Sequence, residues 1–170
     1  MAATMPGMAS GSSYPGRFEL IDTRLWTQLS SNIRSNFGFL SRLSQEDPYN
    51  FSMEGQLIKQ VGSKVFKEVT VAGHQFIVDF LAEYGHTPGT MRRFWLHQAN
   101  ARMMGTVAHQ IGVKSQSLRT TIAEFGNSSA ATIPLTLSIS AREYAYSRGD
   151  IVLMTAAGAG LTGGAAVIRW

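Results

Sequence analysis

The stretch Phe94-Trp95-Leu96-His97-Gln98-Ala99-Asn100 sets a short apolar run directly against a polar turn. Residues 99–111 then carry apolar side chains at helical spacing, and Gly112 closes the pattern. This order predicts a buried strand that passes into a helix. Because α/β folds build their binding sites where strands end, the stretch places the imidazole of His97 at a candidate site.

Two further motifs stand at similar junctions. Gly126-Asn127-Ser128-Ser129-Ala130-Ala131 lies between residues 118–125, whose β-branched content predicts a strand, and a predicted helix at residues 127–146. Gly158-Ala159-Gly160 lies between a predicted buried strand at 151–154 and a final strand at 165–170. The sequence therefore predicts an imidazole, a carboxamide and a flexible glycine turn along one edge of a sheet.

The N-terminal third is less regular. Residues 1–13 are expected to be a flexible leader and residues 14–52 an irregular, partly helical segment, with apolar residues at every fourth position predicting a helix over 22–43. From residue 53 onward, the pattern predicts a long amphipathic helix, nicked near Gly73, that ends at Gly85. The whole order indicates an α/β arrangement with a mixed sheet.

Composition limits the available chemistry. The 170 residues contain no cysteine, so disulfides, thiolate metal sites and a cysteine nucleophile within this chain are excluded. The four histidines lack ligand spacing, so we expect no metal site. The net charge of +4 is scattered along the chain, and we expect no nucleic-acid partner. Apolar stretches are too short or too rich in glycine to span a bilayer, and we expect a cytoplasmic protein without a membrane partner.

Each motif also has a purely structural explanation. His97 could fill the edge of a core, Asn127 could cap a helix, and Gly158-Ala159-Gly160 could form a tight turn. Taken together they suggest more. A neutral imidazole and a carboxamide can both donate to one carbonyl oxygen and stabilise an enolate, and a glycine turn can bring a backbone N–H close to a second oxyanion.

The chain from residue 53 to residue 170 resembles the C-terminal half of 3-oxoacyl-(acyl carrier protein) synthase III and its thiolase-fold relatives. Five motifs, in the family's order, carry the resemblance: Met53-Glu54-Gly55, His97-Gln98-Ala99-Asn100 followed by Arg102, residues 125–131 with Ser128 where Thr is usual, residues 149–153, and Gly158-Ala159-Gly160. The resemblance implies a thiolase-like half-domain over residues 53–170, with helices on both faces of a mixed sheet.

The resemblance also implies a reaction. His97 and Asn127 would be two members of a Cys-His-Asn triad, whose cysteine takes an acyl group from acyl-CoA. The histidine and asparagine would assist the decarboxylation of malonyl-carrier protein, and the resulting carbanion would attack the acyl thioester. The turn Gly158-Ala159-Gly160 would supply one oxyanion N–H, expected from Ala159, and Asn100 would line the pantetheine tunnel. No cofactor beyond these substrates is implied.

The same resemblance suggests a docking surface for the acyl carrier protein. Arg102 would meet this acidic partner, and Lys64 and Lys67, three residues apart on the long predicted helix, could extend the basic rim. Position alone favours the view that Arg102 is a solvated residue on a helix face, because exposed arginines are common.

Two departures from the family pattern matter. The family's cysteine lies in an N-terminal half that this sequence does not contain, and Ala157 and Gly163 stand where some members have bulky aromatics, so acyl-chain length does not carry over. Two hypotheses follow. The chain is the C-terminal half of a condensing enzyme, active only with its cysteine-bearing N-terminal half in a homo- or hetero-dimer. Alternatively, it is a non-catalytic subunit or fragment that stabilises such an enzyme. Retention of both His97 and Asn127 favours the first.

Overall fold

The computed structural model describes residues 2–4, 17–35 and 58–170. Within them, the main sheet has five strands, which are, in spatial order, β1 (Ala2–Thr4), β2 (Arg17–Thr27), β7 (Thr162–Arg169), β6 (Ile151–Gly158) and β5 (Arg93–Leu96). The pair β5–β6 is parallel and the other pairs are antiparallel, so the sheet is mixed as predicted. A separate ribbon pairs β3 (Ile33–Ser35) with β4 (Ile58–Gln60).

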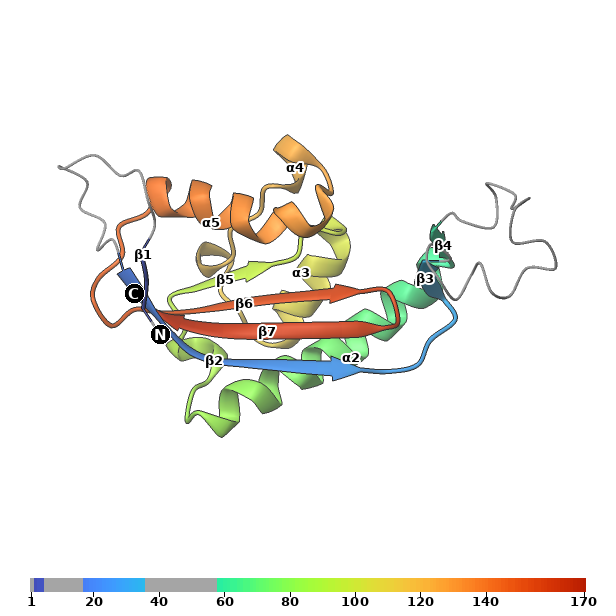
Figure 1. Ribbon diagram of the computed structural model, residues 1–170, viewed down its shortest axis with the longest axis horizontal. Coiled ribbons are helices and arrows are strands. Elements are labelled where there is room, and N and C mark those ends of the chain that lie inside the picture. Colours follow the sequence, from blue (N-terminus) through green and yellow to red (C-terminus); the bar gives the residue numbers. More distant parts are fainter. Residues whose placement is uncertain (1, 5–16, 36–57) are drawn as a thin grey trace.

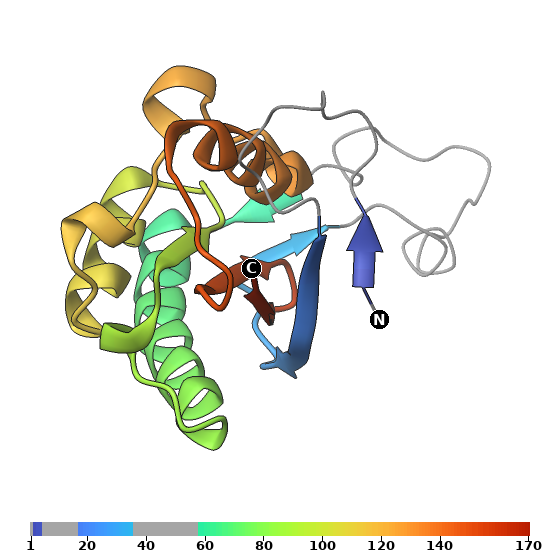
Figure 2. The ribbon, with the colours of Figure 1, turned by 90° about the vertical axis from the view of Figure 1, so that its left-hand side faces the viewer.

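Helices cover both faces of this sheet (Figure 1). Helices α2 (Gly62–Glu83) and α3 (Ala101–Gln110) lie together on one side. Helix α5 (Thr132–Glu143) lies on the other side, preceded by the short α4 (Ile122–Phe125), as the turned view in Figure 2 also shows. Strand β5 contributes to the cores on both sides of the sheet, because its successive side chains point to opposite faces. Phe94 and Leu96 pack into the core under α2 and α3, whereas Trp95 packs into the core under α5. The expected α/β class is confirmed.

Strand β2 corrects the helix predicted over residues 22–43. Residues 17–27 are extended and pair with β7 along almost their whole length, with a bulge between Leu20 and Asp22. The fourfold spacing of apolar residues that suggested a helix is also a multiple of the strand period of two, so it cannot distinguish the two structures. Residues 36–43 lie outside the described part of the chain.

The long amphipathic helix is confirmed with different limits. Helix α2 is unbroken through Gly73, so the expected nick is wrong, and Ile58–Gln60 before it forms strand β4 instead of helix. It ends at Glu83, and Gly85 adopts the left-handed φ of +67° that suits a residue just past a helix end. The turn predicted at Met53-Glu54-Gly55 lies outside the described residues, as do the Tyr14-Pro15-Gly16 turn and most of the expected leader.

The strand predicted over residues 118–125 is the second correction. Only Leu118 makes a bridge, to Phe94, and residues 122–125 form α4. The β-branched Thr121 lies instead in a loop, where its side chain is buried and its N–H donates to the Gln98 side chain over 2.9 Å. A tertiary contact thus overrides the local preference for strand.

Helix α5 lies within the range predicted for a helix at residues 127–146, and it buries a face of short side chains. Its fully buried face carries the hydroxyls of Thr132, Thr136 and Ser140, with Ala141, while its larger aliphatic side chains are half-buried. The hydroxyls are satisfied inside the fold. Thr136 donates to the Thr132 carbonyl over 2.8 Å, and Ser140 accepts from Trp95 Nε1 over 3.0 Å. Short side chains let the helix lie close to the strands beneath it.

Candidate functional site

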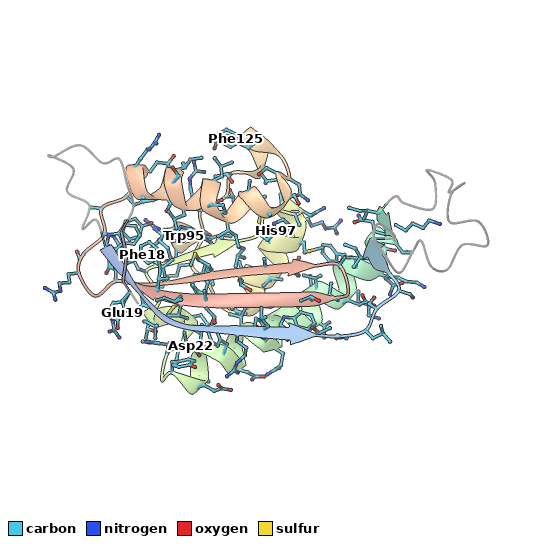
Figure 3. The ribbon with its side chains drawn as sticks, in the orientation of Figure 1. Phe18, Glu19, Asp22, Trp95, His97 and Phe125 are labelled. Atoms are coloured by element: carbon cyan, nitrogen blue, oxygen red, sulfur yellow. The ribbon has the colours of Figure 1, made fainter. Side chains whose placement is uncertain are left out.

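His97 follows the last residue of β5 and lies beneath the end of α5 nearer to α4, as labelled in Figure 3. Its backbone N–H donates to the Thr155 carbonyl over 2.9 Å, which extends the β5–β6 pairing by one residue. Its ring Nδ1 lies 2.6 Å from Thr132 Oγ1, a hydroxyl supplied by the first turn of α5. Burial lowers the pKa of the half-buried His97 below the usual 6.5, which favours a neutral ring at neutral pH.

Asn127 lies in the loop between α4 and α5, directly after Gly126, whose φ is +64°. Its side-chain Oδ1 accepts a hydrogen bond from the Ser129 backbone N–H over 3.0 Å. Because that contact uses the carboxamide oxygen, the Nδ2 amide group is the end left to donate elsewhere. The helix predicted to begin at Asn127 starts later, with a single 3₁₀ turn at Ser129–Ala131 before α5.

A cavity of about 330 Å³ brings the predicted polar groups together. His97, Asn100, Asn127 and Gly158 all line it, although they come from four different segments of the chain. Asn100 has a structural role as well, since its Oδ1 accepts from the Met103 N–H over 3.0 Å and caps the start of α3. Most other lining residues are apolar and come from α2, α3 and the ends of β2 and β6.

The glycine turn is only partly at this cavity. Gly158 lines it, whereas Ala159 and Gly160, which follow in the turn between β6 and β7, are not among the lining residues. The Gly160 N–H donates to the Ile33 carbonyl over 3.3 Å, so it is already used. The Ala159 N–H makes no backbone hydrogen bond with the described residues and remains the available donor of the turn.

The three basic residues predicted to form a docking rim lie outside the cavity lining. Arg102 is exposed on the first turn of α3, and Lys64 and Lys67 are exposed on the first two turns of α2. None of the three forms an ion pair within the described residues. Because α2 and α3 pack against one another and both line the cavity, all three cations belong to the helices that form its wall.

Two residues that support the site were not singled out from the sequence. Gln98 is fully buried, and it donates from Nε2 to the Leu96 carbonyl over 2.7 Å while accepting from the Thr121 N–H, so it ties the end of β5 to the loop before α4. Thr132, 1% exposed, holds the His97 ring. Both are uncharged, and their partners lie 23 and 35 residues away in sequence, so no local pattern marks them.

The described residues contain no group of three or more His, Asp or Glu side chains placed to hold a metal ion. Among the same residues, no helix has the length and apolar character needed to cross a bilayer.

Comparison with known proteins gives a consistent picture. Residues 81–170 match the family model described as 3-oxoacyl-[acyl-carrier-protein (ACP)] synthase III C terminal. The β-ketoacyl-[acyl-carrier-protein] synthase III of Bartonella bacilliformis is 32% identical over 142 residues, covering 84% of this chain and 44% of that protein. The 3-oxopimeloyl-[acyl-carrier-protein] synthase of Brucella abortus is 38% identical over 122 residues, covering 72% of this chain and 37% of that protein.

Solved structures agree with the sequence comparisons. The crystal structure of 3-oxoacyl-[acyl-carrier-protein] synthase III from Aquifex aeolicus VF5 superposes with a TM-score of 0.74 at 25% identity, covering 96% of this chain and 46% of that one. The corresponding enzyme from Thermus thermophilus gives a TM-score of 0.73 at 26% identity, covering 96% and 48%. The thiolase-like fold expected from the sequence is confirmed. The chain spans less than half the length of these relatives.

Proposed function

Because the chain belongs to the C-terminal family of 3-oxoacyl-[acyl-carrier-protein] synthase III, we propose that it is the C-terminal half of a condensing enzyme of that type. It contributes His97 and Asn127 to a Cys-His-Asn triad whose cysteine comes from an N-terminal half outside this chain. The reaction is the decarboxylative Claisen condensation of an acyl thioester with malonyl-acyl carrier protein. The enzyme is an acyltransferase of fatty acid biosynthesis that needs no cofactor beyond its substrates.

One observation carries the proposal. The imidazole of His97 and the carboxamide of Asn127 line the same cavity, and each has one polar atom already engaged by the protein, His97 Nδ1 by Thr132 and Asn127 Oδ1 by Ser129. The groups left for a ligand are His97 Nε2 and Asn127 Nδ2. Where the Thr132 hydroxyl donates to Nδ1, Nε2 carries the ring proton. Two N–H donors are then available for one carbonyl oxygen.

The chemistry of the malonyl half-reaction follows from these donors. The bond between the malonyl carboxylate carbon and the adjacent CH₂ breaks, CO₂ leaves, and the electron pair moves onto the thioester oxygen as an enolate. His97 and Asn127 stabilise this charge by hydrogen bonding. A neutral imidazole is a poor proton donor, so it supports the enolate without quenching it. The enolate carbon then attacks the acyl group on the partner's cysteine, and the cysteine sulfur leaves as thiolate.

The remaining predicted residues take supporting roles in this proposal. The Ala159 N–H of the turn Gly158-Ala159-Gly160 stabilises the oxyanion formed at the acyl thioester. Asn100 lines the passage for pantetheine. Arg102, with Lys64 and Lys67, attracts the acidic carrier protein. A cytoplasmic dimer with the cysteine-bearing half completes the site.

The alternative is a non-catalytic subunit or fragment that stabilises a condensing enzyme. Purification of the chain from its native cells, followed by mass spectrometry of what accompanies it, separates the two hypotheses. The enzyme hypothesis predicts a partner with a cysteine that gains an acyl group from acyl-CoA, and malonyl decarboxylation that requires this chain. A partner that already contains its own His and Asn motifs, and works equally well without this chain, supports the alternative.

A further inference from the structure

The turn between β6 and β7 is bound from outside by the segment that follows β2. Residues 28–33 form this segment, which we call the strap, and in Figure 1 it leaves β2, passes the turn and reaches β3. Gln28 and Leu161 exchange two backbone hydrogen bonds, over 2.8 and 2.6 Å. The Ser30 N–H donates to the Gly160 carbonyl over 2.8 Å, and the Gly160 N–H donates back to the strap over 3.3 Å. Both backbone polar groups of Gly160 are therefore held by the strap.

The turn needs such a tie because its own residues do not make it rigid. Gly158 and Gly160 flank Ala159, and glycine has more conformational freedom than any other residue. On one side, Gly158 is fixed by its pairing with Thr162 on β7, and on the other side Gly160 is fixed by the strap. The Ala159 N–H lies between these two fixed points. A donor to an oxyanion is effective only where its position is set before the reaction, so the strap matters for this N–H.

A single carboxylate on α2 holds the strap. Glu68 Oε2 accepts from the Ser30 hydroxyl over 2.8 Å, and Glu68 Oε1 accepts from Asn32 Nδ2 over 2.6 Å. Ser30 Oγ also accepts from the Asn32 N–H over 3.1 Å, so the three residues form one closed set of hydrogen bonds. All three are partly buried. Hydrogen bonds to a carboxylate are stronger than those between neutral groups, and this set links α2 to the turn by way of the strap.

Glu68 itself lies away from the cavity. Val65 and Val69 on the same helix line the cavity at His97, whereas Glu68 is not a lining residue. It forms no ion pair with any part of the chain that the structure describes. Glu68 can therefore influence a bound substrate only through the residues that it holds.

We propose that Glu68 is a positioning residue that fixes the oxyanion donor of the glycine turn, acting through Ser30 and Asn32 of the strap. The role of the Ala159 N–H rests on the proposed function, but the tie from α2 to the turn does not. The oxyanion exists only during transfer of the acyl group. A displaced donor therefore lowers the maximal rate of that step and leaves the binding of acyl-CoA unchanged. Malonyl decarboxylation, which the other two proposed donors assist, does not use this N–H.

The test compares two variants in the complex of this chain with its cysteine-bearing partner. Glu68→Ala removes both side-chain contacts and places a good helix former in α2. Glu68→Gln keeps both, because its carbonyl accepts from Asn32 and its amide donates to Ser30 Oγ. Mass spectrometry measures acylation of the partner's cysteine over a range of concentrations of acetyl-CoA or octanoyl-CoA, whichever the wild type uses. Malonyl decarboxylation is measured in the same samples.

In Glu68→Ala, the maximal rate of acylation should fall by about 10- to 100-fold, the effect of a displaced reacting group. The half-saturating concentration of acyl-CoA and the rate of decarboxylation should stay close to the wild-type values. Glu68→Gln should retain most of the acylation rate. Asp79→Ala is the matched control, because Asp79 is an exposed acid on the same helix and accepts a hydrogen bond from Gln75 within α2.

Deuterium exchange of the backbone amides tests the tie without catalysis. Peptides that cover residues 158–162 should exchange about 10-fold faster in Glu68→Ala than in the wild type, while peptides from the middle of β6 should not change. The double variant Ser30→Ala/Asn32→Ala breaks the same tie from the strap and should give the same result, so the test does not depend on the folding of one variant.

Unchanged exchange at the turn in these variants would overturn the proposal, and so would an equal loss of acylation and decarboxylation. Faster exchange with unchanged acylation would also overturn it, because the turn would then be held by Glu68 without supplying the donor. A wild-type complex that does not acylate its cysteine would contradict the proposed function instead. The exchange experiment would still decide whether Glu68 holds the turn.

Discussion

At the scale of single residues, one neighbour holds the ring of His97 in place. Thr132 Oγ1 lies 2.6 Å from Nδ1 and the residue is 1% exposed, so water does not compete for this contact. The hydroxyl acts on the substrate only through the ring, which makes Thr132 a positioning residue. Its contribution is to orient the ring and, where the hydroxyl donates to Nδ1, to place the ring proton on Nε2.

We expect Thr132→Val, which preserves shape but lacks the hydroxyl, to leave the His97 ring as a mixture of tautomers. Malonyl decarboxylation by the assembled enzyme should slow by about 2- to 10-fold, the effect of one ordinary hydrogen bond. Thr132→Ser should restore both the single tautomer and the rate of decarboxylation. Nitrogen-15 NMR of the ring reports the tautomer directly. Unchanged ring signals in Thr132→Val, with Val and Ser variants equally active, would remove this role.

Burial of His97 has a consequence for stability. Its pKa is lowered in the folded state, so between the ordinary value of 6.5 and that lowered value the unfolded chain binds more protons than the folded chain. The free energy of unfolding should therefore fall as the pH drops below about 6.5 and be unaffected by this group above it. Urea titrations at several pH values, on the wild type and His97→Gln, check this. The difference between the two should depend on pH only in that acidic window; a difference constant with pH would contradict the expectation.

The position of His97 and Asn127 at one cavity could be predicted because their motifs stand at chain positions where α/β folds change from strand to helix or turn. Thr132 and Gln98 could not, because a buried hydroxyl or amide has no sequence pattern of its own and is identified only by its distant partner. Trp26, which also lines the cavity, was missed for another reason. It lies in a segment predicted to be helical, so its position opposite Gly163 could not be seen.

At the scale of elements, strongly periodic segments were predicted well and ambiguous ones were not. Helix α3 and strands β5, β6 and β7 lie close to their predicted positions, because each has a clear period and a clear boundary. The prediction for the β2 segment failed because apolar residues spaced by four fit both the helical and the strand period. The buried face of α5 could not be predicted, because its small hydroxyl residues, whose hydrogen bonds are satisfied by Trp95 and by the helix backbone, count as polar in any sequence pattern.

Helices α2 and α3 carry the prediction about the carrier protein. Arg102→Glu reverses a charge on the exposed first turn of α3. We expect KM for the carrier-protein substrate to rise, most strongly at low salt, while a short pantetheine substrate is much less affected. Lys114→Glu is the matched control, an exposed cation beyond the end of α3. Equal losses with both substrates would show that Arg102 has a structural role instead.

At the scale of the whole molecule, the α5 side of the sheet has little cover. Within the described residues, only α4 and α5 lie on that side (Figure 1). The aliphatic side chains of α5 are half-buried, and Phe125 at the end of α4 is 51% exposed (Figure 3). In the proposed enzyme the cysteine-bearing half covers this surface, and the active site forms at the contact.

Expressed alone, the chain should therefore self-associate or bind the dye ANS strongly, because exposed apolar surface of this kind is rare on monomers. Supplying the N-terminal half should abolish the dye fluorescence and yield a defined complex in size-exclusion chromatography. A monomeric chain that does not bind the dye would mean that no large partner surface belongs on α5.

The most direct test of the central claim compares the two half-reactions in the complex of this chain with its cysteine-bearing partner. His97→Ala and Asn127→Ala each remove one donor to the enolate oxygen, so malonyl decarboxylation should fall by about 10²- to 10³-fold in either variant. Acylation of the partner's cysteine by acyl-CoA should change much less. Mass spectrometry of the same samples measures it. Near-normal decarboxylation in both variants would contradict the assignment of His97 and Asn127 as the groups that stabilise the enolate.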